Sequence, residues 1–190
     1  MNKKVATAAV IDGILRLGVS TAAIGSVLVL PGLLVAVDKP LSMFDKKMDQ
    51  RAKERELRRI LSYMKRTKLL ESQRYEHGIT ITDKGRKRLE KQGFDQMQIN
   101  QPETWDNKWR LVIFDVPETK KVGRNALSAK LRELGFKTLQ RSVWVHPHPC
   151  HEEIEAVALR YQLTSYITYI ETSYIDKPEI LKNRFANLIK

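Results

Sequence analysis

Trp109-Arg-Leu-Val-Ile-Phe-Asp115-Val-Pro117 is followed further along the chain by Leu134-Gly-Phe-Lys-Thr-Leu-Gln140-Arg-Ser-Val-Trp144-Val, and these stretches decide the fold of the second half. The first predicts an apolar strand that ends on a carboxylate, and the second predicts a helix stop followed by strand. Between them, apolar side chains recur at helical spacing, namely Val122, Ala126, Leu127, Leu131 and Leu134. We expect a strand, a crossover helix at 120–134 and a second strand that pairs in parallel with the first.

The remaining residues of this half predict further strands and another helix. Residues 141–145 continue as strand until two prolines, which cannot donate to a sheet ladder, end it. Residues 150–163 predict a helix that Cys150 caps. Residues 166–171 alternate β-rich side chains and predict the last strand. The order βαββαβ indicates a ferredoxin-like α+β domain, a fold that many unrelated functions share.

Basic charge is concentrated in one segment of the chain. The whole chain has a net charge of +12, and residues 46–91 hold 16 Lys/Arg against 7 Asp/Glu. Residues 100–190 hold 14 basic and 11 acidic residues, so this half is close to neutral. Such a segment is typical of a surface that faces a polyanion. Nucleic acid is therefore the first expected partner, and a membrane headgroup surface is the second.

An apolar run near the N-terminus, residues 17–37, carries no charge and is long enough to cross a bilayer. Glycine, proline and hydroxyl residues interrupt it, and it lacks the aromatic residues that mark membrane interfaces. The alternative is a pair of buried helices, 4–17 and 21–37, joined at Gly18. We favour buried helices, because the basic segment downstream needs a core to pack against, and we keep the membrane anchor as the alternative.

The basic segment has its own secondary-structure pattern. Residues 53–65 predict an amphipathic helix with its apolar face formed by Leu57, Ile60, Leu61 and Met64. Residues 69–82 predict a β-hairpin whose turn is Tyr75-Glu-His-Gly78. Another basic helix begins at Asp83. Helix, hairpin and helix in this order indicate a winged helix-turn-helix, whose supporting helices come from the N-terminal residues.

In a winged module the helix before the hairpin enters the DNA major groove, and the hairpin reaches the backbone or the minor groove. The residues expected to contact DNA are cationic side chains of these elements: Arg55, Arg58, Arg59, Lys65, Arg66, Arg74, His77, Lys84 and Arg86. Contacts of this kind to phosphates give affinity and salt dependence without specifying a sequence. The alternative explanation is an ordinary solvated helix face.

The second half of the chain resembles CRISPR-associated protein two. In that family the first strand ends on Asp, as at Asp115, and a Gly-x-x-x-x-Gln-x-Ser-Val-aromatic segment follows, as in Gly135-Phe-Lys-Thr-Leu-Gln140-Arg-Ser142-Val-Trp144. With a winged helix in front, the combination resembles the PaaX-type transcriptional repressors of phenylacetate catabolism. The resemblance covers roughly residues 45–175. The chain departs from those repressors in its apolar N-terminus and in its shorter C-terminal helical region.

The resemblance to CRISPR-associated protein two implies that Asp115 is a catalytic metal ligand for phosphodiester hydrolysis, brought near its mate by dimerisation. One carboxylate per chain can share a Mg²⁺ ion with its mate, because Mg²⁺ keeps several of its waters. The same residue has a structural explanation, because Asp-Val-Pro-Glu is typical strand-to-turn sequence and a carboxylate satisfies turn amides. Both explanations are open at this point.

A run of possible zinc ligands, His146-Pro-His148-Pro-Cys150-His151, follows the predicted strands. We expect its prolines to point successive side chains apart, so that the run forms a turn and holds no metal. The single cysteine excludes an internal disulfide and a zinc site of several cysteines. The tryptophans are expected in the core or at a domain interface: Trp105, Trp109 and Trp144.

The expected organisation is a winged-helix DNA-binding domain at 1–98, a linker at 99–108, a ferredoxin-like domain at 109–175 and a C-terminal helix at 176–190. The expected function is a cytoplasmic DNA-binding transcriptional regulator that needs no cofactor and binds double-stranded DNA as a homodimer through its ferredoxin-like domain. The alternative is a Mg²⁺-dependent endonuclease in which the winged helix delivers DNA to Asp115. A membrane-tethered DNA-binding protein is a weaker third hypothesis.

Overall fold

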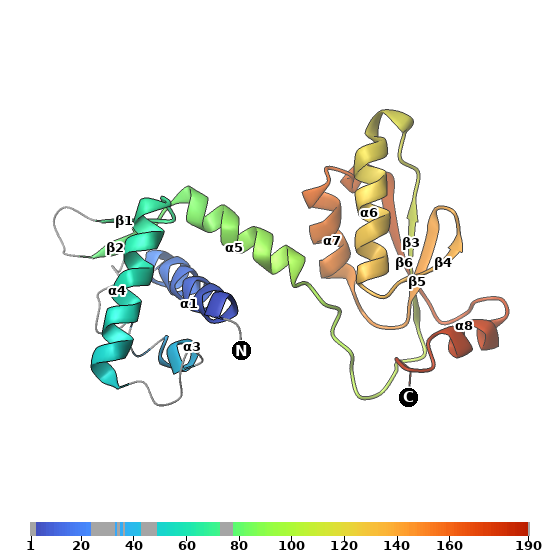
Figure 1. Ribbon diagram of the computed structural model, residues 1–190. Coiled ribbons are helices and arrows are strands. Elements are labelled where there is room, and N and C mark those ends of the chain that lie inside the picture. The colour runs from blue at the N-terminus through green and yellow to red at the C-terminus, as the bar shows by residue number, and fades with distance from the viewer. Residues whose placement is uncertain are drawn as a thin grey trace. The chain divides into compact units, whose positions relative to one another are not determined.

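The computed structural model describes residues 3–23, 33, 35, 37–42, 49–72 and 78–189. The chain forms two units, Met1–Gln96 and Met97–Lys190. Within the described residues, the first unit holds helices and a two-stranded sheet, and the second holds a four-stranded sheet with helices (Figure 1). The α+β class predicted from the sequence is therefore confirmed.

The described elements of the first unit are α1 (Lys3–Ala23), α3 (Asp38–Ser42), α4 (Gln50–Arg66), β1 (Leu70–Ser72), β2 (Ile79–Ile81) and α5 (Asp83–Asp95). Helix α1 continues past Gly18, so the predicted helix end there is wrong. A glycine inside a helix costs only about 1 kcal/mol, and the complete burial of Val10 and Ile14 on α1 outweighs that cost. Most of residues 21–37, where a second helix or a membrane span was expected, lies outside the described residues. No helix within the described parts of the chain combines the length and apolar character needed to cross a membrane.

Helix α4 turns the predicted apolar face into the core of the first unit. The buried side chains of α4 are Leu57, Ile60, Leu61 and Met64. They share one core with Ile14 of α1 and with Ile79 of the hairpin. The helix begins at an N-cap, where Asp49 Oδ1 accepts a hydrogen bond from the Ala52 amide at 2.7 Å. At its other end the left-handed backbone of Lys68 (φ 57°) turns the chain into β1.

The predicted hairpin and the helix after it are confirmed. Strands β1 and β2 pair antiparallel with Leu70 opposite Ile81, and the turn between them lies mostly outside the described residues. Thr82 caps α5, because its Oγ1 accepts a hydrogen bond from the Gly85 amide at 3.2 Å. Position 85 requires glycine, since a Cβ there would lie 2.4 Å from the carbonyl oxygen of Leu69. This close approach fixes α5 against the hairpin.

The elements of the second unit are β3 (Trp109–Phe114), η1 (Glu118–Lys120), α6 (Lys121–Glu133), β4 (Lys137–Gln140), β5 (Val143–His146), α7 (His151–Arg160), η2 (Thr164–Tyr166), β6 (Ile167–Thr172) and α8 (Pro178–Arg184). The strand order is β4-β5-β3-β6, and all neighbours are antiparallel. The prediction that β3 and the strand after α6 pair in parallel is wrong, because β5 lies between them. Strand β4 is exposed along its length whereas β5 is mostly buried, so the more apolar strand takes the inner position.

The two faces of this sheet are covered by different helices. Helices α6 and α7 lie side by side on one side of the sheet (Figure 1). Val112 and its cross-strand partner Trp144 belong to the face under α6, because the guanidinium of Arg132 on α6 lies over the Trp144 ring. The opposite face carries Trp109 and Val145, which pack against apolar side chains of α8. Trp109 and Trp144 are both buried, as expected.

The predicted end of α6 is correct, whereas the predicted cap of α7 is wrong. Helix α6 stops at Gly135 (φ 90°), and the Phe136 amide donates back to the Leu131 carbonyl at 3.0 Å. Cys150 stands at the N-cap position of α7, but its side chain makes no capping hydrogen bond. Its buried Sγ lies 3.9 Å from Tyr169 Oη instead. Burial raises the pKa of the Cys150 thiol to about 12, so the thiol stays protonated at neutral pH.

Candidate nucleic-acid interface

The outer side of α4 is lined by cations. The five residues of this helix predicted to contact DNA are all exposed, and Arg51 joins them: Arg51, Arg55, Arg58, Arg59, Lys65 and Arg66. At about 3.6 residues per turn, the six fall on the side of the helix opposite its buried stripe. Glu54 and Glu56 flank this arc without entering it. We call these six residues the cationic face.

Sequence reasoning missed Arg51 because it placed the helix start too late. The signal was Asp49, a residue type favoured at N-caps, directly before Gln50. Arg74 and His77, which were predicted near the tip of the wing, lie outside the described residues.

Neighbouring side chains position two arginines of the cationic face. Arg59 donates through Nε and Nη2 to the carboxylate of Glu56, at 2.9 and 2.5 Å. This hydrogen bond raises the pKa of Arg59. The guanidinium of Arg66 lies 5.9 Å from the centroid of the Tyr63 ring. Planar guanidinium groups held in this way are well suited to phosphate oxygens.

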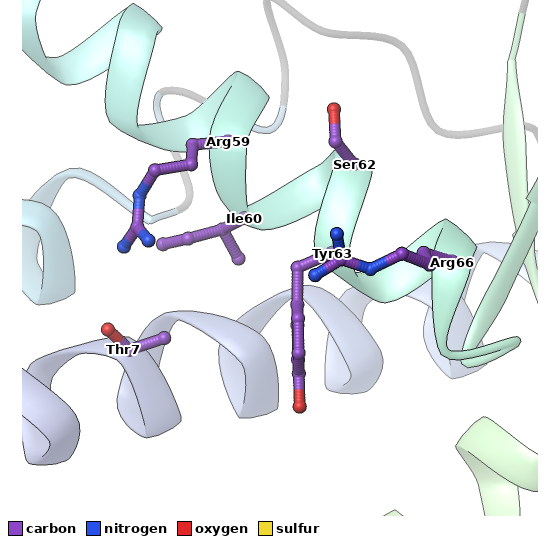
Figure 2. Close-up of a pocket in the computed structure, with 6 residues that line it drawn as sticks. All are labelled: Thr7, Arg59, Ile60, Ser62, Tyr63 and Arg66. Carbon is purple, nitrogen blue, oxygen red and sulfur yellow. The ribbon is translucent and has the colours of Figure 1, made fainter.

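A pocket of about 470 Å³ lies between α1 and α4 at the edge of the cationic face (Figure 2). The described residues that line it are Thr7, Arg59, Ile60, Ser62, Tyr63 and Arg66. In Figure 2, Arg59 and Tyr63 extend from α4 toward α1, and the guanidinium of Arg66 lies beside the Tyr63 ring. Arginine, serine and tyrosine side chains are among the groups that proteins use to contact the DNA backbone.

The structure also brings together predicted residues from α4 and α5. Lys65, Lys84 and Arg86 line one pocket of about 750 Å³ beside the hairpin. Lys84 Nζ donates to the Thr67 carbonyl oxygen at 2.9 Å, at the carboxyl end of α4. A cation is favourable there, because the helix dipole is negative at that end. Lys84 therefore supports α4 as well as adding to the basic surface.

Asp115 lies in the second unit, exposed just after β3, at a pocket of about 680 Å³. The cations of this pocket are Arg124 and Arg132 on α6 and Arg141 between β4 and β5. Its other carboxylate, Glu118, is bonded to Arg124 Nη2 at 2.9 Å. We call this the Asp115 pocket.

The Asp115 pocket does not fit a magnesium ion. Mg²⁺ binds oxygen ligands and is repelled by cations, yet three guanidinium groups line the pocket. Within the described residues, no group of three His, Cys, Asp or Glu side chains could hold a metal ion. We therefore derive no catalytic step at Asp115, and the nuclease hypothesis gains no support from these residues.

The run of possible zinc ligands forms a buried contact between two histidines. The rings of His146 and His148 have centroids 5.6 Å apart, and the His148 amide donates to His146 Nδ1 at 3.1 Å. The expectation that the prolines point these two side chains apart is therefore wrong. Burial lowers the pKa of both rings, that of His146 to about 4, so both are neutral at pH 7. Cys150 and His151 contact Tyr169 instead, so the four side chains do not converge.

Residues expected to form a linker at 99–108 are bonded to the second unit. Buried Arg110 donates to the carboxylate of Asp106 and, through Nη1, to the Pro147 carbonyl oxygen at 2.7 Å. Trp105 Nε1 also donates to Pro147, at 3.0 Å. These bonds hold the segment before β3 against the end of β5.

One comparison with known proteins matches most of this second unit. The family model described as the PaaX protein central Cas2-like domain matches residues 102–182. A solved structure similar to the chain is the uncharacterized protein Rv0674 from Mycobacterium tuberculosis, with a TM-score of 0.38 and 19% identity, covering 69% of this chain and 52% of that one. The chain thus spans about half the length of that protein. No curated protein matches the sequence. Residues 102–182 are therefore similar to the PaaX central Cas2-like domain, as the motifs around Asp115 and Trp144 indicated.

Proposed function

We propose that the protein is a DNA-binding transcriptional regulator of the PaaX type. One observation carries the proposal: α4 presents the cationic face opposite its buried stripe, and a β-hairpin follows directly. An ordinary solvated helix mixes charges of both signs around its exposed surface. On α4 the two neighbouring glutamates lie outside the arc. Glu56 pairs with Arg59, whereas the other five cations of the face form no ion pair with a described residue, and this excess of positive charge favours a polyanionic partner.

In this proposal the first unit is a winged helix, with α4 as the recognition helix and β1–β2 as the wing. The second unit is a ferredoxin-like domain. Its elements follow the order βαββαβ, and β5 is inserted between β3 and β4, which supports a split βαβ arrangement. The B-DNA major groove is about 12 Å wide and admits one α-helix.

The cationic face would act mainly on the DNA backbone. Guanidinium and ammonium groups contact phosphates and release condensed counterions, which makes affinity fall steeply with salt. Five such contacts correspond to a slope of log K against log salt of about −4.5. Backbone contacts set the register of the protein on the duplex but carry no sequence information.

We extend the proposal to a homodimer formed through the second unit. The sheet face that α8 covers at one end carries partly exposed Ile113 and Val143 and 40% exposed Ile170. They lie on one face, because Ile113 pairs with Val143, and Ile170 pairs with Leu111 two positions away. A two-fold dimer built there would bury these side chains and present two α4 helices to related half-sites. Light scattering should then find a dimer for the full chain and a monomer for Ile170→Asp.

Fluorescence anisotropy of the full chain with labelled mixed-sequence duplex DNA, over a series of salt concentrations, tests the DNA-binding proposal. The double variant Arg55→Gln/Arg58→Gln should bind at least about tenfold more weakly and lower the salt slope by about 2. The matched control Lys108→Gln/Lys137→Gln removes the same charge from exposed positions of the second unit and should keep the slope. Equal losses in both double variants, or a wild type insensitive to salt, would overturn the proposal.

A further inference from the structure

The Asp115 pocket is a concave site whose cations are only partly neutralised. Arg124 is paired with Glu118, whereas Arg132 and Arg141 form no ion pair with any described residue. Asp115 is the remaining carboxylate of the lining, and it also lacks an ion pair within the described residues. The pocket therefore offers two guanidinium groups that have no ion pair with a described residue, and Asp115 is the one carboxylate of its lining that also has none.

The orientation of Arg132 is fixed by an aromatic ring. Its guanidinium carbon lies 5.3 Å from the centroid of Trp144, a residue of β5 that is only 2% exposed. A guanidinium that stacks on an aromatic face keeps its N–H donors in the plane of the group, available to a ligand. Trp144 thus turns a flexible surface side chain into a positioned donor.

Polar side chains complete the wall of the pocket. Hydroxyl and amide groups come from α6, β4 and the β4–β5 turn: Asn125, Ser128, Thr138 and Ser142. They add neutral hydrogen-bond donors to the arginines. The volume of about 680 Å³ lies within the range of pockets that hold small molecules, about 300–1,000 Å³.

We propose that the Asp115 pocket binds a phosphate-bearing small molecule. Guanidinium forks match phosphate oxygens two at a time, and a phosphate monoester carries about −1.5 to −2 charges at neutral pH, which suits two unpaired arginines. The carboxylate of Asp115 repels an anion bound in this pocket. Removing its charge should therefore strengthen binding, the opposite of what a metal ligand would show.

Titration of the full chain with inorganic pyrophosphate, followed by tryptophan fluorescence and calorimetry at low ionic strength, tests the proposal. The three tryptophans all lie in the second unit, so fluorescence does not report pyrophosphate bound at the cationic face. We expect saturable binding that weakens at least tenfold in Arg132→Gln and in Arg141→Gln. Both arginines are exposed, so both variants should keep the wild-type circular dichroism spectrum.

Matched variants separate this site from the rest of the basic surface. Lys137→Gln removes a neighbouring charge of β4 that is absent from the pocket lining, and it should leave the affinity unchanged, as should Arg55→Gln/Arg58→Gln. Asp115→Asn should bind pyrophosphate several-fold more tightly. Absence of saturation, equal weakening in Lys137→Gln, or loss of binding in Asp115→Asn would overturn the proposal. Citrate binding as tightly as pyrophosphate would overturn its assignment to phosphate ligands.

Discussion

The cationic face of α4 and the Asp115 pocket both gather arginines, but they do so in different ways. The cationic face takes its six cations from one helix at regular spacing and presents them outward. The pocket takes Arg124 and Arg132 from α6 and Arg141 from a turn, and folding brings them around a hollow. An outward row suits an extended polyanion, whereas converging guanidinium groups suit a compact anion. The same residue type therefore supports two chemistries, and the surrounding backbone decides which.

The largest expected effect comes from a substitution that destabilises the unit carrying the cationic face and leaves the Asp115 pocket intact. Gly85→Ala would place a Cβ 2.4 Å from the Leu69 carbonyl oxygen, which is held in place by the Thr82 amide at 3.2 Å. We expect the free energy of unfolding of the first unit to fall by about 3 kcal/mol. DNA binding should weaken, and pyrophosphate binding should persist. Far-UV circular dichroism follows both units during urea unfolding, whereas tryptophan fluorescence follows the second unit alone.

The control for this variant lies in the same helix. A Cβ added at Gly93 meets nothing within 4 Å. Gly93→Ala should therefore leave the first unit intact and stabilise it by up to about 1 kcal/mol, because alanine is the better helix former. Equal destabilisation by the two substitutions, or a tryptophan transition that moves with Gly85→Ala, would contradict the account.

Acid pH should act on the second unit. His146 is buried beside the rings of Phe136 and Phe185, and burial lowers its pKa from 6.5 to about 4. As pH falls below 6.5, the unfolded chain binds this proton before the folded chain does. The stabilisation is therefore complete above pH 6.5 and is lost progressively down to about pH 4, by about 3 kcal/mol in total. Urea unfolding followed by tryptophan fluorescence at a series of pH values measures this loss.

The variant His146→Gln separates the contribution of His146 protonation from that of other titrating groups. It should reduce the pH dependence between 6.5 and 4, whatever its own stability, and leave the smaller slope that comes from His148, whose pKa burial also lowers. A wild-type second unit equally stable at pH 7 and pH 4.5 would contradict the assignment, as would an unchanged slope in the variant.

The smallest expected effect sharpens the description of the cationic face. Asp49→Ala removes the oxygen that accepts the Ala52 amide, and should destabilise the first unit by about 1 kcal/mol. Asp49→Asn removes the same charge but keeps an N-cap acceptor, so it should cost much less. Urea unfolding followed by circular dichroism compares the two variants. Similar losses of stability in both variants would mean that the charge of Asp49, and not its capping hydrogen bond, stabilises the first turn of α4, which carries Arg51.

The sequence predicted features whose cause is local. The buried stripe of α4, the hairpin and the stop at Gly135 follow from spacing or from one residue's backbone preference. Features that depend on contacts distant in sequence were wrong or missed. The continuous α1 depends on the core around it, and the insertion of β5 beside β3 depends on which strand is more apolar.

The two candidate sites differ in the same way in how far the sequence predicts them. The cationic face could be predicted because helical period alone brings its residues together. The Asp115 pocket could not be predicted, because no spacing in the sequence brings its arginines together. Folding of the sheet places Trp144 against Arg132, and the β4–β5 turn places Arg141 in the same pocket lining. The resemblance to CRISPR-associated protein two predicts a metal ligand at Asp115, whereas the guanidinium groups around that carboxylate favour an anion.

Amide chemical shifts of the full chain, recorded by NMR with duplex DNA and separately with pyrophosphate, show whether the two arginine-rich regions bind different ligands. We expect DNA to perturb residues 50–66 and the start of α5, and pyrophosphate to perturb residues around Asp115, Arg132 and Arg141. DNA shifts centred on the Asp115 pocket, with α4 unaffected, would contradict it.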